Sequence, residues 1–200
     1  MRYADDIVLG FQHASDAQRF QCELGRRLSK FGLELHPDKT RLLRFGRFAA
    51  RDAALASERG PGTFDFLGFT HASASPREGR FRIIRRTSKV RMRATLRTLR
   101  GRLMQNRHRP IPEQGAWLRR FLQGYFQYYA IPTNGRRLCE FRTQVIGNWL
   151  HALRRRSQRH RMTWSRLNVL VQRWLPPVRI LHPWPEDRFF ANTRDKSPVR

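Results

Sequence analysis

The sequence predicts an α+β fold, in which a partial antiparallel sheet with one helix is followed by an all-α helical bundle. Short apolar runs alternate with polar residues in the first part of the chain, whereas apolar residues in the second part recur every three or four positions, as in amphipathic helices. Charge divides the chain at the same place, because residues 80–185 hold 25 Lys and Arg but only two acids, Glu113 and Glu140. We therefore predict two domains, residues 1–86 and residues 87–200.

The chain begins with a predicted hairpin that carries two adjacent carboxylates. Tyr3 and residues 7–9 suit strands, and Asp5 and Asp6 suit a two-residue turn between them. Carboxylate oxygens are the ligands that Mg²⁺ prefers, and this ion usually takes only one or two of them from a protein. On these residues alone, a polar turn that happens to contain two acids is the favoured interpretation; the rest of the chain reverses that preference.

A helix is predicted over residues 16–31. Ser15 followed by Gln18 is the pattern of a capping box at its start, and Gly32 suits the left-handed position that ends a helix. Between them, steps of three and four residues predict one apolar stripe, which consists of Ala17, Phe20, Leu24, Leu28 and Phe31.

Short strands are predicted after this helix. Residues 33–35 and 40–45 suit strands on either side of a turn at residues 36–38, and residues 46–62 are predicted to be a surface loop. The remaining predicted strands are residues 64–69 and 80–85, separated by a loop that contains Ser75 and Pro76.

Four amphipathic helices are predicted in the second part of the chain. Their starts are indicated by Ser88, Pro112, Asn134 and Thr163, of which Pro112 suits the first helical position. Their apolar stripes, in chain order, are Met92, Leu96, Leu99 and Leu103; Trp117, Leu118, Phe121, Leu122, Tyr125, Phe126 and Tyr129; Leu138, Phe141, Val145, Trp149, Leu150 and Leu153; and Leu167, Leu170, Val171 and Trp174. After Pro176 and Pro177, the segment 180–185 is predicted to be extended and packed by Ile180, Leu181 and Trp184.

The composition points to a polyanionic partner. The chain of 200 residues has a formal net charge of +26, which repels itself unless nucleic acid or an anionic membrane surface neutralises it. No apolar run approaches the ~20 residues of a spanning helix, so we expect no membrane-embedded segment. Cys22 and Cys139 fit no metal spacing and are expected to be free thiols in a reducing, cytoplasmic compartment.

The second part of the chain carries the predicted nucleic-acid contacts. A charge run is often only a solvated helix face, but the lack of acids over a hundred residues favours polyanion binding. The candidate basic residues here are Arg91, Arg93, Arg97, Arg100, Arg119, Arg120, Arg154, Arg155, Arg156, Arg159 and Arg161. Tyr125, Phe126 and Tyr129 are predicted to be core, whereas Tyr128 lies off their stripe and is the candidate for stacking on a base.

These motifs resemble the reverse transcriptase/maturase proteins encoded by group II introns. The segment 3–6, Tyr-Ala-Asp-Asp, is similar to the metal-binding hairpin of reverse transcriptases. The segments 31–40 and 64–69 resemble those that follow the catalytic hairpin in the bacterial intron-encoded proteins. The remaining resemblance is to the thumb, or maturase-specific domain, and lies in residues 117–129, 149–150, 154–158, 164 and 176–183.

The resemblance implies an RNA-directed DNA polymerase that also helps its intron RNA to fold, splice and move. Two Mg²⁺ ions would activate the attacking 3′-hydroxyl and stabilise the leaving pyrophosphate. Asp5 would be the principal catalytic residue and metal ligand, and Asp6 a secondary one. Lys39 would match a basic position beyond the palm helix and contact nucleic-acid phosphate. Phe66, Leu67 and Gly68 would form the primer grip, where glycine permits close approach of the primer end. Group II intron RNA and a DNA primer or target would be the partners.

One departure from the family decides what we expect of this chain alone. The family's polymerases need a further aspartate upstream of the hairpin, and fingers that hold template and nucleotide. We therefore expect a C-terminal fragment, from a truncated or split gene or an internal start, that does not synthesise DNA by itself unless a separate chain supplies the missing palm and fingers. The alternatives are a stand-alone RNA-binding maturase module and a remnant without function.

Overall fold

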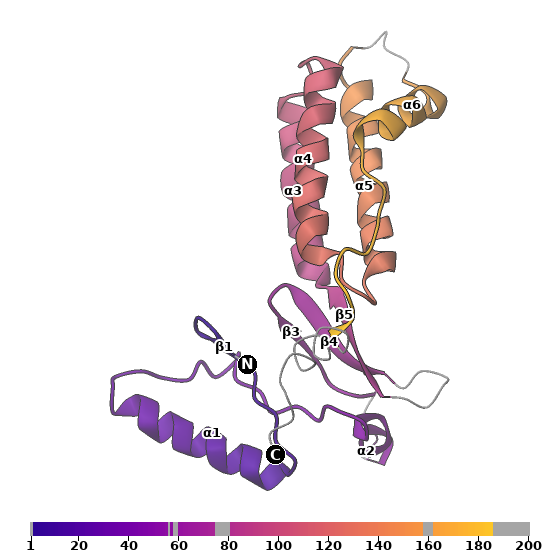
Figure 1. Cartoon of the computed structure of the whole chain (residues 1–200). Coiled ribbons are helices and arrows are strands. Elements are labelled where there is room, and N and C mark those ends of the chain that lie inside the picture. The colour runs from indigo at the N-terminus through magenta and orange to yellow at the C-terminus, as the bar shows by residue number, and fades with distance from the viewer. Residues whose placement is uncertain (1, 56, 58–59, 75–80, 158–161, 186–200) are drawn as a thin grey trace, which may run out of the picture. The chain divides into compact units, whose positions relative to one another are not determined.

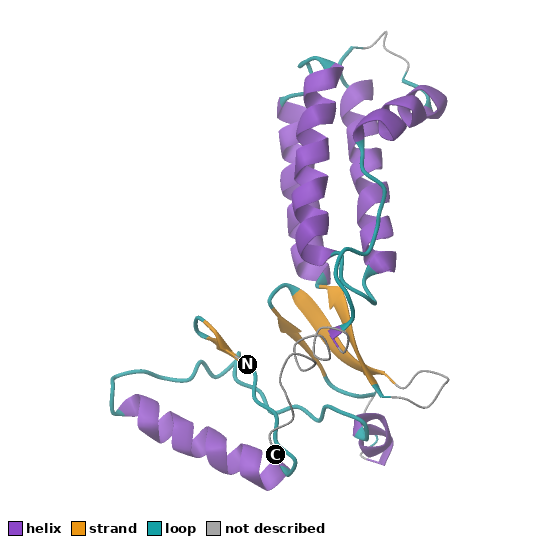
Figure 2. Ribbon diagram, in the orientation of Figure 1, coloured by secondary structure: helices purple, strands orange, loops and turns teal. Residues whose placement is uncertain are grey.

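The computed structural model describes residues 2–55, 57, 60–74, 81–157 and 162–185. The chain divides into two compact units: the first unit is Met1–Phe66 with Ala72–Ile83, and the helical unit is Leu67–His71 with Ile84–Arg200. Within the described residues there are six helices and five strands, and this mixed content agrees with the predicted α+β class (Figures 1 and 2). None of these helices has both the length and the apolar character needed to cross a membrane.

The predicted hairpin at the start of the chain is present, with a different turn. Strand β1 (Arg2–Tyr3) pairs antiparallel with β2 (Asp6–Ile7), and Tyr3 lies opposite Asp6. The turn therefore consists of Ala4 and Asp5, and the prediction that both aspartates occupy the turn was wrong. In this turn Ala4 has a φ of 52°, the positive value that the first central residue of a type I′ or II′ hairpin turn takes.

Helix α1 (Ala14–Ser29) confirms the predicted helix but starts two residues earlier. Its N-cap residue is His13, so Ser15 lies inside the first turn and the predicted capping box does not form. The predicted left-handed ending is confirmed: Gly32 has φ 67°, its N–H donates to Ser29 O at 3.1 Å, and the Leu33 N–H donates to Leu28 O at 3.1 Å. These two bonds are those of a Schellman motif. No residue of α1 is buried.

The segment after α1 differs most from the sequence prediction. Residues 33–35 and 40–45 are not strands, because they pair with no other strand among the described residues. The turn predicted at residues 36–38 is confirmed by N–H groups of Lys39 and Thr40 that donate to His36 O. The predicted surface loop at 46–62 contains helix α2 (Ala49–Leu55), whose Ala49 and Ala53 are buried.

The strand predicted at residues 64–69 is broken into a hairpin. β3 (Thr63–Phe66) and β4 (Phe69–Ala74) are joined by a turn at Leu67 and Gly68, and β4 is the central strand of a three-stranded sheet with β5 (Arg82–Thr87). The predicted strand at 80–85 is thus confirmed with a shift of two residues. The predicted loop with Ser75 and Pro76 lies outside the described residues.

The helical unit contains α3 (Lys89–Gln105), α4 (Ile111–Tyr129), α5 (Gly135–Arg154) and α6 (Trp164–Trp174). Figure 1 shows α3, α4 and α5 running side by side, with α6 at one end of α5. Every residue of the apolar stripes predicted for α3 and α5 is buried. The residues of the stripes predicted for α4 and α6 are buried or partly buried. Pro112 is the second residue of α4 and not the first. The side chains that were predicted to pack segment 180–185 are exposed instead, namely Ile180, Leu181 and Trp184, and that part of the prediction was wrong.

The buried side chains of Gln114 and Trp149 connect α4, α5 and the loop between α3 and α4. Gln114 of α4 donates through Nε2 to the backbone oxygens of Asn106, Arg107 and Arg109 at 2.9–3.3 Å. Its Oε1 atom accepts the indole N–H of Trp149 at 3.0 Å. Gln114 therefore closes the loop between α3 and α4 and satisfies the one polar atom of a fully buried indole.

A second buried polar cluster lies where β5 meets α3. Asn134 Oδ1 accepts from Thr87 N, and Asn134 Nδ2 donates to Thr87 Oγ1 and to Tyr129 O, each at 2.8 Å. Asn134 was predicted to cap α5, and it does occupy the N-cap position, but its side chain makes no cap bond there. It joins the end of α4 to the start of α3 instead.

We predict that Gly115→Ala destabilises the helical unit, whereas Gly124→Ala in the same helix stabilises it. A Cβ on Gly115 would overlap the indole of Trp174, whose Cδ1 would lie 2.8 Å away, and overpacking of this kind costs about 1–3 kcal/mol. A Cβ on Gly124 meets nothing within 4 Å, so alanine gains about 0.5–1 kcal/mol of helix propensity. Urea unfolding followed by far-UV circular dichroism measures both. A neutral Gly115→Ala would show that α6 does not pack on α4 as described.

Candidate nucleic-acid interface

The acidic hairpin presents its two carboxylates to solvent. Asp5 lies in the turn, Asp6 begins β2, and both are exposed. Among the described residues, no group of three or more His, Cys, Asp and Glu side chains is arranged to hold a metal ion. The donor set here is therefore a pair of adjacent carboxylates, which suits a hard ion such as Mg²⁺ only as part of a larger set of ligands.

The predicted primer-grip residues occupy the β3–β4 hairpin. Phe66 ends β3 and is buried, and Leu67 and Gly68 have φ angles of 50° and 77°. Positive φ at both central residues is the signature of a type I′ turn. In the helical unit, the Ser88 N–H donates to Gly68 O at 2.9 Å, and a Cβ on Gly68 would lie 2.9 Å from the Tyr129 hydroxyl. The positive φ and this close contact within the chain both favour glycine at position 68.

Helix α3 carries a row of cations on one flank of its buried stripe. Arg93, Arg97 and Arg100 follow one another at helical spacing, and Lys89, which was not among the predicted residues, begins the same row four positions earlier. We call Lys89, Arg93, Arg97 and Arg100 the α3 cation row; all four side chains are exposed. Arg91, also exposed, lies on the opposite flank. The i, i+4 spacing in the sequence could have identified Lys89.

Three of the predicted arginines also bind backbone carbonyls. Arg119 of α4 donates to the Trp174 and Arg173 oxygens at the end of α6 and lies over the Trp174 ring. Arg154 donates to Met162 O at 3.0 Å, and Arg156 donates to His108 O at 3.3 Å. These side chains stabilise helix ends and loops, although they keep their charge. Arg120, Arg155 and, in the first unit, Lys39 are exposed, whereas Arg159 and Arg161 lie outside the described residues.

Both acids between residues 84 and 185 are held by neighbouring arginines. Glu140 accepts from Arg137 at 2.7 Å and from Arg136 at 3.2 Å, and the hydrogen bond from Arg137 lowers the pKa of Glu140. Glu113 lies 4.0 Å from Arg109. Exposed pairs of this kind contribute little stability, but they leave no described carboxylate in this unit to neutralise the α3 cation row.

The tyrosines at the end of α4 divide into core and surface, as predicted. Tyr125 is buried and stacks on Phe141 with ring centroids 3.8 Å apart, and burial raises the pKa of both Tyr125 and Tyr129. Tyr128 keeps 51% of its surface exposed. Its hydroxyl donates to Leu67 O at 2.8 Å and its ring stacks on Phe69 at 5.7 Å. Tyr128 is therefore an exposed aromatic ring held in one orientation.

Comparisons with protein-family models, with curated proteins and with solved structures found no match to this chain.

Proposed function

We propose that this chain binds RNA through its helical unit, as a relative of the reverse transcriptase/maturase proteins of group II introns, with intron RNA as its ligand. The observation that carries the proposal is the charge of the helical unit. The α3 cation row is exposed, and the two acids at residues 84–185 are already paired with arginines. Such a surface attracts a polyanion, and no unpaired carboxylate among the described residues of the helical unit competes for it.

The spacing of the α3 cation row suits a chain of phosphates. Residues four apart on a helix place their Cβ atoms about 5–6 Å from each other, and like charges at this spacing cost an isolated helix about 0.2–0.5 kcal/mol per pair. Phosphates bound along the row remove this repulsion. They also release condensed counterions, which drives association and makes the affinity depend steeply on salt.

The packing of the two units favours RNA binding over DNA synthesis as the activity of this chain. The helical unit has a continuous core in which Trp149, Phe141 and several leucines are fully buried. In the described part of the first unit, the buried apolar side chains are Ala49, Ala53 and Phe66. A basic surface on a well-packed unit is the property of a binding module.

Asp5 and Asp6 are proposed to contribute to a Mg²⁺ site of the polymerase type. Their carboxylate oxygens are suitable ligands, and Mg²⁺ bound there would neutralise charge on phosphate oxygens. Among the described residues, no third His, Cys, Asp or Glu side chain joins them, so a complete site needs ligands besides these two carboxylates. What the chain itself supplies is a tight hairpin that holds two carboxylates at adjacent positions.

Competition between RNAs tests the proposed ligand. We expect the full chain to bind a group II intron RNA with submicromolar affinity and to prefer it to a scrambled RNA of equal length and composition. The expected preference arises because a folded RNA presents phosphates in a fixed arrangement that a rigid basic surface can match. Fluorescence anisotropy with each RNA as competitor measures it. Equal affinity for both RNAs would contradict the maturase assignment while leaving RNA binding intact.

A further inference from the structure

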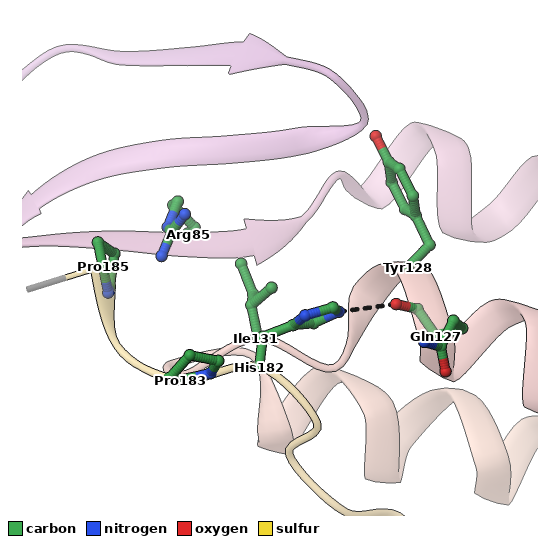
Figure 3. A pocket seen from close by; sticks show the side chains of 7 residues that line it. All are labelled: Arg85, Gln127, Tyr128, Ile131, His182, Pro183 and Pro185. Carbon is green, nitrogen blue, oxygen red and sulfur yellow. Dashed lines mark hydrogen bonds between the residues drawn. The ribbon is translucent and has the colours of Figure 1, made fainter. Parts of the chain in front are cut away.

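A pocket in the helical unit lies beside the exposed ring of Tyr128. Its volume is about 330 Å³, and it is lined by Arg85, Gln127, Tyr128, Ile131, His182, Pro183 and Pro185. Figure 3 shows Tyr128 on one side of it, Arg85 and Pro185 on the other, and Ile131 and His182 between them. This volume lies at the small end of the ~300–1,000 Å³ typical of ligand sites. It suits one planar group and not an extended segment.

Hydrogen bonds fix the walls of this pocket. The N–H groups of Leu181 and His182 both donate to Ala130 O, at 2.9 and 3.2 Å, and hold the final segment against the end of α4. The His182 ring donates from Nε2 to Gln127 O at 2.7 Å. Tyr128 is anchored by Leu67 and Phe69. A pocket whose walls are already ordered loses little entropy when a ligand enters.

The groups that the pocket offers a ligand are flat apolar surfaces and one cation. The Tyr128 hydroxyl and His182 Nε2 are engaged with backbone carbonyls, whereas the Tyr128 ring, the two proline rings and Ile131 present apolar surface. Arg85 is half-buried, and a guanidinium with five N–H donors can bind a phosphate oxygen in addition to a protein acceptor. Among the described residues, no acid lines the pocket.

We propose that this pocket holds one unpaired base of the bound RNA, with the base against the Tyr128 ring and the adjacent phosphate on the Arg85 guanidinium. This inference rests on the proposed RNA binding and narrows its ligand to RNA with unpaired nucleotides. Stacking on an aromatic ring accepts any base, because every base has a π-face. A paired base inside a duplex has no exposed face to offer, so the pocket discriminates against perfect duplex.

An RNA hairpin with one bulged 2-aminopurine, compared with the same hairpin without the bulge, tests the proposal. We expect the full chain to bind the bulged hairpin about 5- to 100-fold more tightly. Tyr128→Leu should abolish this preference, whereas Tyr128→Phe should keep it. Both variants lose the hydroxyl bond to Leu67, so their difference reports the ring alone. The 2-aminopurine emission should be more strongly quenched in the wild-type and Tyr128→Phe complexes than in the Tyr128→Leu complex.

Controls separate this proposal from RNA binding in general. Trp164→Leu removes another exposed ring, 55% exposed and outside the pocket, and should leave the preference unchanged. Arg85→Gln should reduce the preference more than Arg166→Gln, an equal charge change at an exposed residue of α6. Equal binding of the two hairpins, or equal effects of Tyr128→Leu and Tyr128→Phe, would overturn the pocket assignment. Failure to bind either hairpin would overturn the RNA-binding proposal itself.

Discussion

Replacing the α3 cation row by glutamine should weaken RNA binding and flatten its salt dependence. The variant Lys89→Gln, Arg93→Gln, Arg97→Gln, Arg100→Gln removes four exposed charges from a helix that also relies on a buried apolar stripe. Each phosphate contact with a single strand contributes about 0.7 to the slope of log affinity against log salt concentration, so the slope should fall by about 3. At 50 mM salt we expect a loss of roughly 10- to 100-fold in affinity.

A second quadruple variant controls for net charge. Arg19, Arg26, Arg27 and Arg41 are exposed arginines of the first unit, and their replacement by glutamine lowers the charge of the chain by the same amount. We expect this control to retain most of the wild-type slope. The helical content of both variants should equal that of wild type, because glutamine is a good helix former. If the slope fell equally in both quadruple variants, RNA binding would depend on the total charge of the chain and not on the α3 cation row.

Asn134→Ala should cost the helical unit about 2–4 kcal/mol of unfolding free energy. The change removes three hydrogen bonds of 2.8 Å and leaves the Thr87 N–H without its acceptor in a site where Thr87 is 2% exposed. A buried polar group left without a partner costs about 1–3 kcal/mol, and the cavity adds to this cost. Urea unfolding followed by far-UV circular dichroism measures the loss.

Asn106→Ala is the matched control for this prediction. The side-chain amide of Asn106, like that of Asn134, donates a hydrogen bond of 2.8 Å to a backbone oxygen, in this case that of Arg102. This bond, however, lies at the protein surface, at the C-terminal end of α3. Water replaces the lost partner there, so the change should cost less than about 1 kcal/mol. Equal costs for the two variants would contradict the role given to Asn134 at the junction of β5, α3 and α4.

The helical unit was largely predictable because its information is local. Each helix carries one apolar stripe, and the surface that covers that stripe belongs to the same unit, as Leu99 and Trp149 illustrate by their complete burial. Periodicity therefore sufficed to place the helices and their core. Some details were predicted wrongly, such as the hydrogen bonds of the Asn134 side chain. They depend on Thr87 of β5, which lies 47 residues away in sequence.

The first unit was predicted less well because a strand needs a partner. Residues 33–35 and 40–45 have suitable side chains for strands, but side-chain preference does not provide a neighbouring backbone with which to pair. The same limit applies to α1, whose stripe is amphipathic in sequence while Phe20 stays 37% exposed and Phe31 70% exposed. The type I′ turn at Leu67 and Gly68 was missed because apolar residues continue through it, from Phe66 and Leu67 to Phe69, and resemble one uninterrupted strand.

The positive charge of the candidate interface was predictable, but which of its arginines also bind backbone carbonyls was not. The excess of Arg over acids is a property of the sequence alone. Which arginines also bind carbonyls depends on loops and helix ends that the chain brings together, as for Arg119 and the end of α6. The pocket beside Tyr128 likewise joins residues from β5, α4 and the final described segment, which no spacing rule connects.

The salt dependence of RNA affinity tests the central claim most directly. The dissociation constant of the unmodified chain for a structured RNA should be measured between ~50 and ~200 mM salt by fluorescence anisotropy. If the basic helices bind phosphates, log affinity should fall linearly with log salt, with a slope of about −3 or steeper. A slope near zero over this range would contradict the claim that the helical unit is an RNA-binding module.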